Sequence, residues 1–191
     1  APISTAALYT GVDNKTAIQW YEFCREVCSG KMLRDKAPLG GPGHEVEIDE
    51  SLLFKRKSHV GRIDHQTWVV GCYDTTVKKG FLQRVPGRSA ETLEAVIIEN
   101  VLPGTKLGYI HRTINHSTNF VDPETGACTN HIEAYWSRIE RRLKYVTGSS
   151  GDIKWSRVDE SMYREMYGFT AKKNFQNFYT FLEHTAVVYP S

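Results

Sequence analysis

The stretch GGPGHEVEIDES, residues 40–51, places a carboxylate-rich strand directly after a cluster of glycines. Side chains alternate between the two faces of a strand, so Val46 and Ile48 share one face while Glu47 and Asp49 share the other. The pattern predicts one face packed in a core and one face that could hold a cation. Acidic strand ends are usually solvated turn residues, and on this strand alone that alternative stays open.

Three strand-like runs extend outward from this stretch, and a helix follows them. Polar or glycine-containing turns separate EVEIDESLLF (45–54), TWVVGCYDTT (67–76) and GFLQRVPG (80–87). Sequential strands with short connections form an antiparallel meander. The next segment, residues 89–101, has apolar residues at helical spacing after Ser89, a favourable N-cap.

The later segments complete an α/β pattern. Residues 103–107 and 109–117 resemble short strands, and a long helix with an apolar stripe begins at about Thr129. The order of meander, helix, strand and helix predicts an α/β domain with a mixed sheet and flanking helices. Two aromatic-rich helices then follow, whose rings we expect in the core rather than as a platform for stacking bases. These rings belong to Tyr163, Tyr167, Phe169, Phe175, Phe178, Tyr179 and Phe181.

A separate helix is expected before the strands. The run 12–33 has apolar residues at helical spacing, with Asp13 or Asn14 as its N-cap. The segment RDKAPLGGPG follows it and is rich in proline and glycine, as linkers are. The sequence therefore divides into residues 1–37 and 38–191.

Length and composition limit the classes of protein to consider. With 191 residues and 40% hydrophobic content, the chain can bury one good core. No window approaches the roughly 20 apolar residues of a membrane span, and residues 1–11 lack a secretory leader, so we expect an intracellular protein with no membrane partner.

Four cysteines are too few for a disulfide framework. Cys24 and Cys28 share a helix face, which fits a metal site or, as we expect, two small buried hydrophobes.

The net charge of +2 is near neutral, so an anionic partner would have to meet a local basic patch. One such patch, FKRKSHVGR (54–62), has no acid and carries Lys55, Arg56, Lys57 and Arg62. Basic runs are usually solvated loops, and contact with nucleic acid is the alternative.

A second candidate carboxylate is Glu133, in TGACTNHIEAYW (125–136). Asn130 as N-cap with Glu133 three residues later makes an acceptable capping box, which would give Glu133 a structural role only. A Glu in a first helical turn can also face a neighbouring strand end. Asp49 and Glu133 would then share a divalent cation, which hard carboxylate oxygens suit.

Other kinds of site find no support in the sequence. His111, His116 and His131 match no closed zinc pattern, so we expect structural or DNA-contacting roles for them. The chain has no GxSxG, P-loop or GxGxxG motif. Esterase, NTPase and nucleotide-cofactor functions are therefore not indicated.

Several motifs in order resemble the transposase of Merlin-type cut-and-paste elements and its bacterial insertion-sequence (ISXO-like) relatives. They are GGPGHEVEIDES, GRIDHQTWVVGCYD, RSAETLEAVIIENVLPGT and YIHRTINHSTNFVDPETGACTNHIEAYW. The resemblance runs from about Thr10 to Pro190 and implies a DDE enzyme with a ribonuclease-H-like fold. In that family three acids hold two Mg²⁺ or Mn²⁺ ions for in-line attack on a phosphodiester. By position, the first acid is Asp49 and the last is Glu133.

The same resemblance implies that DNA is the partner, as element ends and as target, with a homo-oligomer assembling on it. The protein would then be DNA-associated, in the nucleus or the nucleoid. Residues 12–28 resemble the last helix of the family's N-terminal DNA-binding region. The candidate contacts to DNA are Lys55, Arg56, Lys57, Arg62, His116, Arg138, Arg141 and Arg142.

The chain departs from the family at the second aspartate, which lies just after the strand that follows LPGT. Here VLPGTKL (101–107) runs directly into GYIHRTINHS, and residues 93–121 contain no Asp. Two parallel strands need a crossover of a dozen or more residues, which Gly108 alone cannot supply. We therefore expect residues 105–117 to form one extended segment, with one family strand and its crossover helix absent.

Loss of one carboxylate removes a metal ligand and leaves the geometry of phosphoryl transfer underdetermined. We expect transposase ancestry with little or no activity, and with Asp49 and Glu133 as the surviving ligands. The alternative is a noncatalytic DNA-binding or assembly protein that retains the fold.

Overall fold

The structure, a computed structural model, describes residues 2–53, 67–109, 130–143 and 151–190. The chain forms two compact units, one built from two separate segments of the sequence and one from a single segment. The first comprises residues 1–36 and 146–191, and the second comprises residues 37–145. This grouping differs from the predicted division, in which residues 146–191 belong with the sheet.

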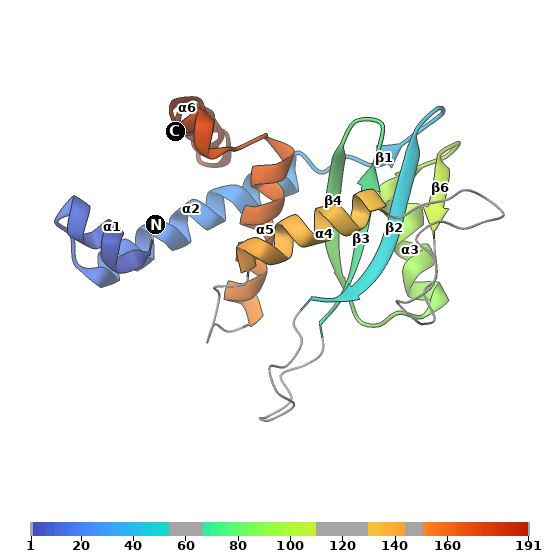
Figure 1. The fold of residues 1–191 in the computed structure, drawn as a ribbon, viewed down its shortest axis with the longest axis horizontal. Helices are drawn as coiled ribbons and strands as arrows, with labels where there is room; N and C mark the ends of the chain where they lie inside the picture. The colour runs from blue at the N-terminus through green and yellow to red at the C-terminus, as the bar shows by residue number, and fades with distance from the viewer. Residues whose placement is uncertain (1, 54–66, 110–129, 144–150, 191) are drawn as a thin grey trace, which may run out of the picture. The chain divides into compact units, whose positions relative to one another are not determined.

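The second unit contains a four-stranded mixed sheet, as predicted (Figure 1). The strand order is β4-β3-β2-β6. β3 pairs antiparallel with both β2 and β4, and β6 pairs parallel with β2. The antiparallel meander is therefore confirmed. The strands are β2 (Glu45–Leu52), β3 (Trp68–Asp74), β4 (Lys79–Val85) and β6 (Lys106–Tyr109).

A separate short parallel pair consists of β1 (Leu39–Gly40), in the glycine-rich segment before β2, and β5 (Val101–Leu102), which directly follows α3. Gly40 has φ +87°, and a Cβ there would lie 2.2 Å from Thr105 Oγ1. The Thr105 hydroxyl instead accepts a hydrogen bond from the Gly41 amide at 2.8 Å. The glycine cluster thus lets the backbone before β2 approach the turn before β6 closely.

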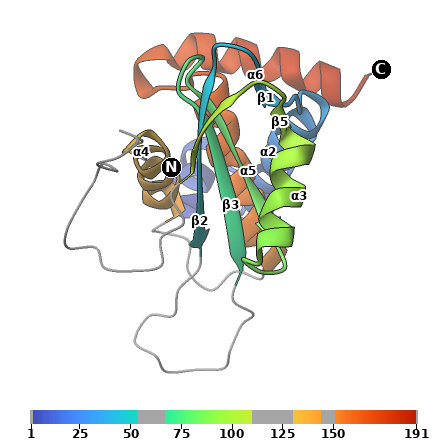
Figure 2. The ribbon, with the colours of Figure 1, turned by 90° about the vertical axis from the view of Figure 1, so that its right-hand side faces the viewer.

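Two helices cover opposite faces of the sheet, as Figure 2 shows. One is α3 (Ala90–Asn100), whose N-cap is Ser89 as predicted: the Ser89 hydroxyl accepts from the Thr92 amide at 3.3 Å. On this side the predicted apolar face of β2 is buried with its neighbours in one core. That core consists of Leu39, Val46, Ile48, Val70, Cys72, Val85, Leu93 and Val96.

The other face, which carries Glu47 and Asp49, is covered by α4 (Asn130–Leu143). Its buried stripe lies over a position of β3 that has no side chain. A Cβ on Gly71 would lie 3.0 Å from Trp136 and 3.1 Å from Ile132. The stripe consists of Ile132, Tyr135, Trp136, Ile139 and Leu143, which agrees with the predicted helix.

The segment around Gly108 is a single strand. β6 runs from Lys106 through Gly108 to Tyr109, so the predicted extended segment is confirmed over these residues. Residues 110–117 of that segment lie outside the described residues.

The first unit is helical. The Asp13 side chain caps α2 through the amides of Lys15 and Thr16, as predicted. A hydrogen bond from Ser29 to Asp159, 2.6 Å long, joins α2 to α5. The elements are α1 (Ile3–Thr10), α2 (Asn14–Arg34), α5 (Gly151–Met166), the 3-10 helix η1 (Ala171–Lys173) and α6 (Asn174–Val188). None of the helices in the described part of the chain combines the length and apolar character needed to cross a membrane.

The aromatic residues of the last two helices divide between core and surface. Tyr163 is buried and bonds His184 Nδ1 through its hydroxyl at 2.6 Å. Phe175, Phe178 and Tyr179 are 84%, 58% and 62% exposed, so the prediction that they lie in the core is wrong. Helical spacing shows that a face is apolar, but it does not supply an element to cover that face.

Candidate active site

The three carboxylates on one face of β2 have different surroundings. Glu45 is partly exposed, with the Lys106 ammonium 3.4 Å from its carboxylate. Glu47 is only 2% exposed, and Asp49 is half-buried. Strand alternation alone makes these acids equivalent, and the packing of α4 distinguishes them.

Glu47 contacts the beginning of α4. Its Oε2 accepts a hydrogen bond from the Ile132 backbone amide at 2.8 Å, and its Oε1 lies 2.7 Å from His131 Nδ1. The first amides of a helix have no partner within the helix and carry partial positive charge, so a buried carboxylate is well placed here. Glu47 therefore anchors the first turn of α4 to β2.

Asp49 and the helix that carries Glu133 lie on the same side of the sheet. Asp49 is two residues after Glu47 on the same face of β2, and its cross-strand partner is Gly71. The first turn of α4, which contains the half-buried Glu133, packs against that position through Ile132. The register of β2 and the packing of α4 thus bring Asp49 and the turn of Glu133 to one region.

Binding of a divalent cation by Asp49 and Glu133 stays a prediction. Asp49 and Glu133 offer the hard oxygen donors that Mg²⁺ and Mn²⁺ prefer. Within the described ranges, however, no three His, Cys, Asp or Glu side chains form a group that could hold a metal ion. The carboxylate oxygens of Asp49 and Glu133 are suitable ligands for the cation, but these are two side chains and not three.

The predicted DNA contacts divide between α4 and segments outside the description. On α4, Arg138 is half-buried with its guanidinium 5.7 Å from the centre of the Tyr135 ring, while Arg141 and Arg142 are exposed in the last turn. Cations at the end of a helix stabilise its dipole, and this role is compatible with binding phosphate. Lys55, Arg56, Lys57, Arg62 and His116 lie outside the described residues, as does His111.

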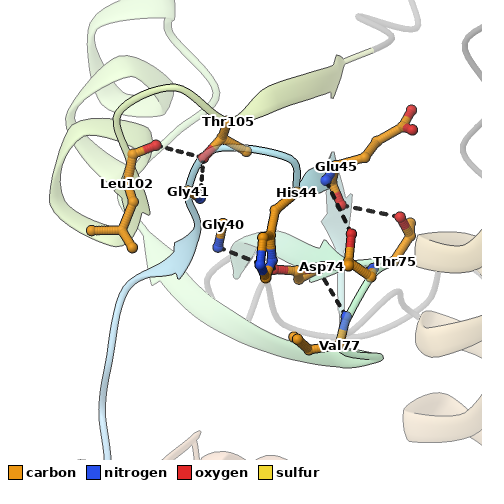
Figure 3. A network of polar contacts seen from close by, with 10 residues as sticks. Gly40, Gly41, His44, Glu45, Asp74, Thr75, Val77, Leu102 and Thr105 are labelled. Atoms are coloured by element: carbon orange, nitrogen blue, oxygen red, sulfur yellow. Dashed lines mark hydrogen bonds and ion pairs between the residues drawn. The ribbon is translucent and has the colours of Figure 1, made fainter.

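A network around Asp74, at the end of β3, was not predicted (Figure 3). The carboxylate is 1% exposed and lies 2.7 Å from His44 Nδ1. Three backbone amides also donate to it, those of Gly40 (3.1 Å), Thr76 (2.9 Å) and Val77 (3.2 Å). Burial by itself raises the pKa of Asp74, but the hydrogen bonds from His44 and these amides outweigh burial and lower the pKa below its ordinary value.

The Asp74 network has a structural role separate from the candidate metal ligands. Because Asp74 is ionised at neutral pH and can only accept, His44 Nδ1 must carry the proton. His44 precedes β2 and Asp49 is five residues further on, which corresponds to about 16 Å along an extended strand. The sequence signal for this network was the DTT turn after β3, where an Asp commonly bonds amides two and three residues on.

The cysteines behave as predicted for small hydrophobes. Burial raises the pKa of the Cys28 thiol to about 12 and also raises that of the half-buried Cys24. Both thiols are therefore protonated at neutral pH, as expected of small hydrophobic side chains in an apolar environment. Cys128 lies outside the described residues.

The candidate site therefore consists of an anchored helix turn facing an acidic strand. Comparisons with models of known families, with curated proteins and with solved structures found no match to this chain.

Proposed function

We propose that this chain derives from a metal-dependent DNA transposase, binds DNA, and retains two of three catalytic acids with impaired or absent activity. One observation carries the proposal: β2 and α4 bring Asp49 and the helix turn of Glu133 to the same face of the sheet. These are the first and last acids that the family resemblance assigns. They come from segments more than 80 residues apart, since Glu47 and Ile132 differ by 85 positions.

The position of β6 supports the same proposal. β6 pairs in parallel with β2. The last residue of β6, Tyr109, is the register partner of Ile48, and Ile48 directly precedes Asp49 in β2. In the family, the second aspartate follows the corresponding strand. Residues 93–121 contain no Asp, so this chain supplies no aspartate there. A mixed sheet of this kind is compatible with a ribonuclease-H-like fold, which we include in the proposal.

A divalent cation held by Asp49 and Glu133 would supply Lewis-acid stabilisation of a phosphodiester oxygen or activation of a water. The residues of the chain contribute binding and orientation: the carboxylates hold the charge, and α4 presents Arg141 and Arg142 at its opposite end. With one acid missing, we expect a large loss of rate, because positioning and charge stabilisation account for most of the catalysis.

A noncatalytic DNA-binding or assembly protein of the same ancestry is the second candidate. It is favoured by the incomplete set of metal ligands in the described part of the chain. The decisive experiment is strand cleavage and joining of duplex DNA with Mn²⁺, comparing the wild-type chain with Asp49→Ala. Cleavage that depends on Asp49 supports a residual enzyme. Binding without cleavage, unchanged by Asp49→Ala, supports the noncatalytic protein.

DNA binding itself is tested through its salt dependence. Each phosphate contact contributes a slope of about −0.9 in a plot of log affinity against log salt concentration. The double variant Arg141→Ala/Arg142→Ala should therefore make the slope shallower by up to about 2. The matched control is Lys172→Ala/Lys173→Ala, which removes two exposed cations from η1. An affinity that does not change with salt would contradict the proposed DNA contact.

A further inference from the structure

The most deeply buried carboxylate of β2 is not one of the two candidate metal ligands. Glu47 is 2% exposed, whereas its neighbours Glu45 and Asp49 on the same face are both partly exposed. Burying a carboxylate costs free energy unless the charge is hydrogen-bonded. The partners of Glu47 should therefore reveal why an acid is present at this position.

Both oxygens of Glu47 are directed to a single element. Oε2 accepts from the Ile132 amide at 2.8 Å and Oε1 lies 2.7 Å from His131 Nδ1, so the carboxylate spans the first turn of α4. The tautomer of His131 that carries its hydrogen on Nδ1 can donate to Oε1. The His131 ring also lies nearly parallel to the Tyr73 ring, with centroids 6.5 Å apart, which further restricts its orientation.

The side chain of Ile132 also packs closely on the sheet. Ile132 is fully buried and lies where a Cβ of Gly71 would come within 3.1 Å. Gly71 is the cross-strand partner of Asp49. The residue immediately after Ile132 is Glu133, so whatever fixes Ile132 also fixes the backbone from which Glu133 extends.

We propose that Glu47 is a positioning residue: it holds the first turn of α4 on the face of β2 that carries Asp49, so that Glu133 and Asp49 can share a divalent cation. This inference rests on the proposed function and deepens it. Each oxygen of Glu47 has a hydrogen-bonding partner on α4, so the proposal assigns this carboxylate to the helix and not to the cation. The acid-rich strand thus divides its carboxylates between holding the helix and binding the metal.

The test combines a structural readout with Mn²⁺ affinity in the full chain. Glu47→Leu removes both acceptors while keeping the site filled. We expect the Ile132 amide to exchange with solvent at least about tenfold faster, because its acceptor is lost, while amides paired between β3 and β4 keep their protection. The Mn²⁺ dissociation constant, measured by electron paramagnetic resonance, should rise about 10- to 100-fold, as for other residues that orient metal ligands.

Two further variants keep the test valid if Glu47→Leu fails to fold. Glu47→Gln retains one acceptor for the Ile132 amide, so it should preserve most of that protection and lose less Mn²⁺ affinity than Glu47→Leu. Glu45→Gln is the matched control, since it removes a charge from the same face of the same strand. It should leave Ile132 exchange unchanged and weaken Mn²⁺ binding less than Glu47→Gln does.

The outcomes separate this inference from the proposed function. If the wild-type chain binds Mn²⁺, Asp49→Ala abolishes binding and neither Glu47 variant weakens it more than Glu45→Gln, only the role of Glu47 is overturned. If the wild-type chain binds no Mn²⁺, the metal site and the positioning role both fall. Faster Ile132 exchange together with weaker Mn²⁺ binding in the Glu47 variants supports the proposal.

Discussion

At the scale of single residues, Asp74 illustrates how one buried carboxylate can join three backbone segments. It accepts hydrogen bonds from Gly40 at the end of β1, from His44 just before β2, and from the turn after β3. Asp74→Asn would place an amide NH₂ against these donors, because one side-chain oxygen cannot serve both sides. We expect a loss of about 2–4 kcal/mol in the free energy of unfolding at neutral pH, measured by urea denaturation.

The pH dependence of this loss follows from the pKa of Asp74. Its folded-state pKa is lowered, so the carboxylate stabilises the fold above its unfolded-state pKa, and this contribution disappears as pH falls through the folded-state value. The difference between wild type and Asp74→Asn should be constant above about pH 5 and shrink as the pH falls below about 4. Glu94→Gln, at an exposed position of α3, is the control and should show no such trend. A gap between wild type and Asp74→Asn that stays constant down to pH 2 would contradict this account.

At the scale of elements, the approach of α4 to the sheet depends on Gly71. A Cβ there would lie 3.0 Å from Leu82 and Trp136 and 3.1 Å from Ile132. Gly71→Val should therefore destabilise the chain by about 1–3 kcal/mol through overpacking. Strand propensity alone favours Val over Gly by up to about 1 kcal/mol, so the sign of the change distinguishes the two effects.

The measurement for Gly71→Val is again urea denaturation, with amide exchange of α4 to locate the disturbance. Gly87→Val is the matched control: no atom lies within 4 Å of a Cβ at Gly87, and its change should stay within about 0.5 kcal/mol. A Gly71→Val variant as stable as wild type, with unchanged exchange in α4, would show that this contact does not limit the packing.

The elements also show how far sequence reasoning reaches. The sequence predicts Ser89 as an N-cap, either Asp13 or Asn14 as another, and the β2–β3–β4 meander from its turns, because these signals act over a few residues. Glu47 looked like any acid on the exposed face of a strand, since its partners come 84 and 85 residues later. Likewise, an apolar stripe on α6 could not reveal that Phe175 and Tyr179 stay exposed. Local chemistry was predictable, and the partners brought by tertiary folding were not.

At the scale of the whole molecule, the contiguous unit of residues 37–145 interrupts the helical unit formed by residues 1–36 and 146–191. The contiguous unit contains all pairings of the mixed sheet, the core under α3 and both predicted metal ligands. A segment that contains its own core and every strand pairing of the described residues has what independent folding requires. We therefore expect residues 37–145, expressed alone, to fold.

The measurement is urea unfolding of residues 37–145 and of the full chain, each with and without Asp74→Asn. The isolated segment should unfold in one cooperative transition. Because the partners of Asp74 among the described residues lie inside it, the loss caused by Asp74→Asn should match that in the full chain to within about 0.5 kcal/mol. A segment without a cooperative transition would contradict independent folding. A segment that folds but shows a much smaller loss would mean that the Asp74 network depends on residues outside 37–145.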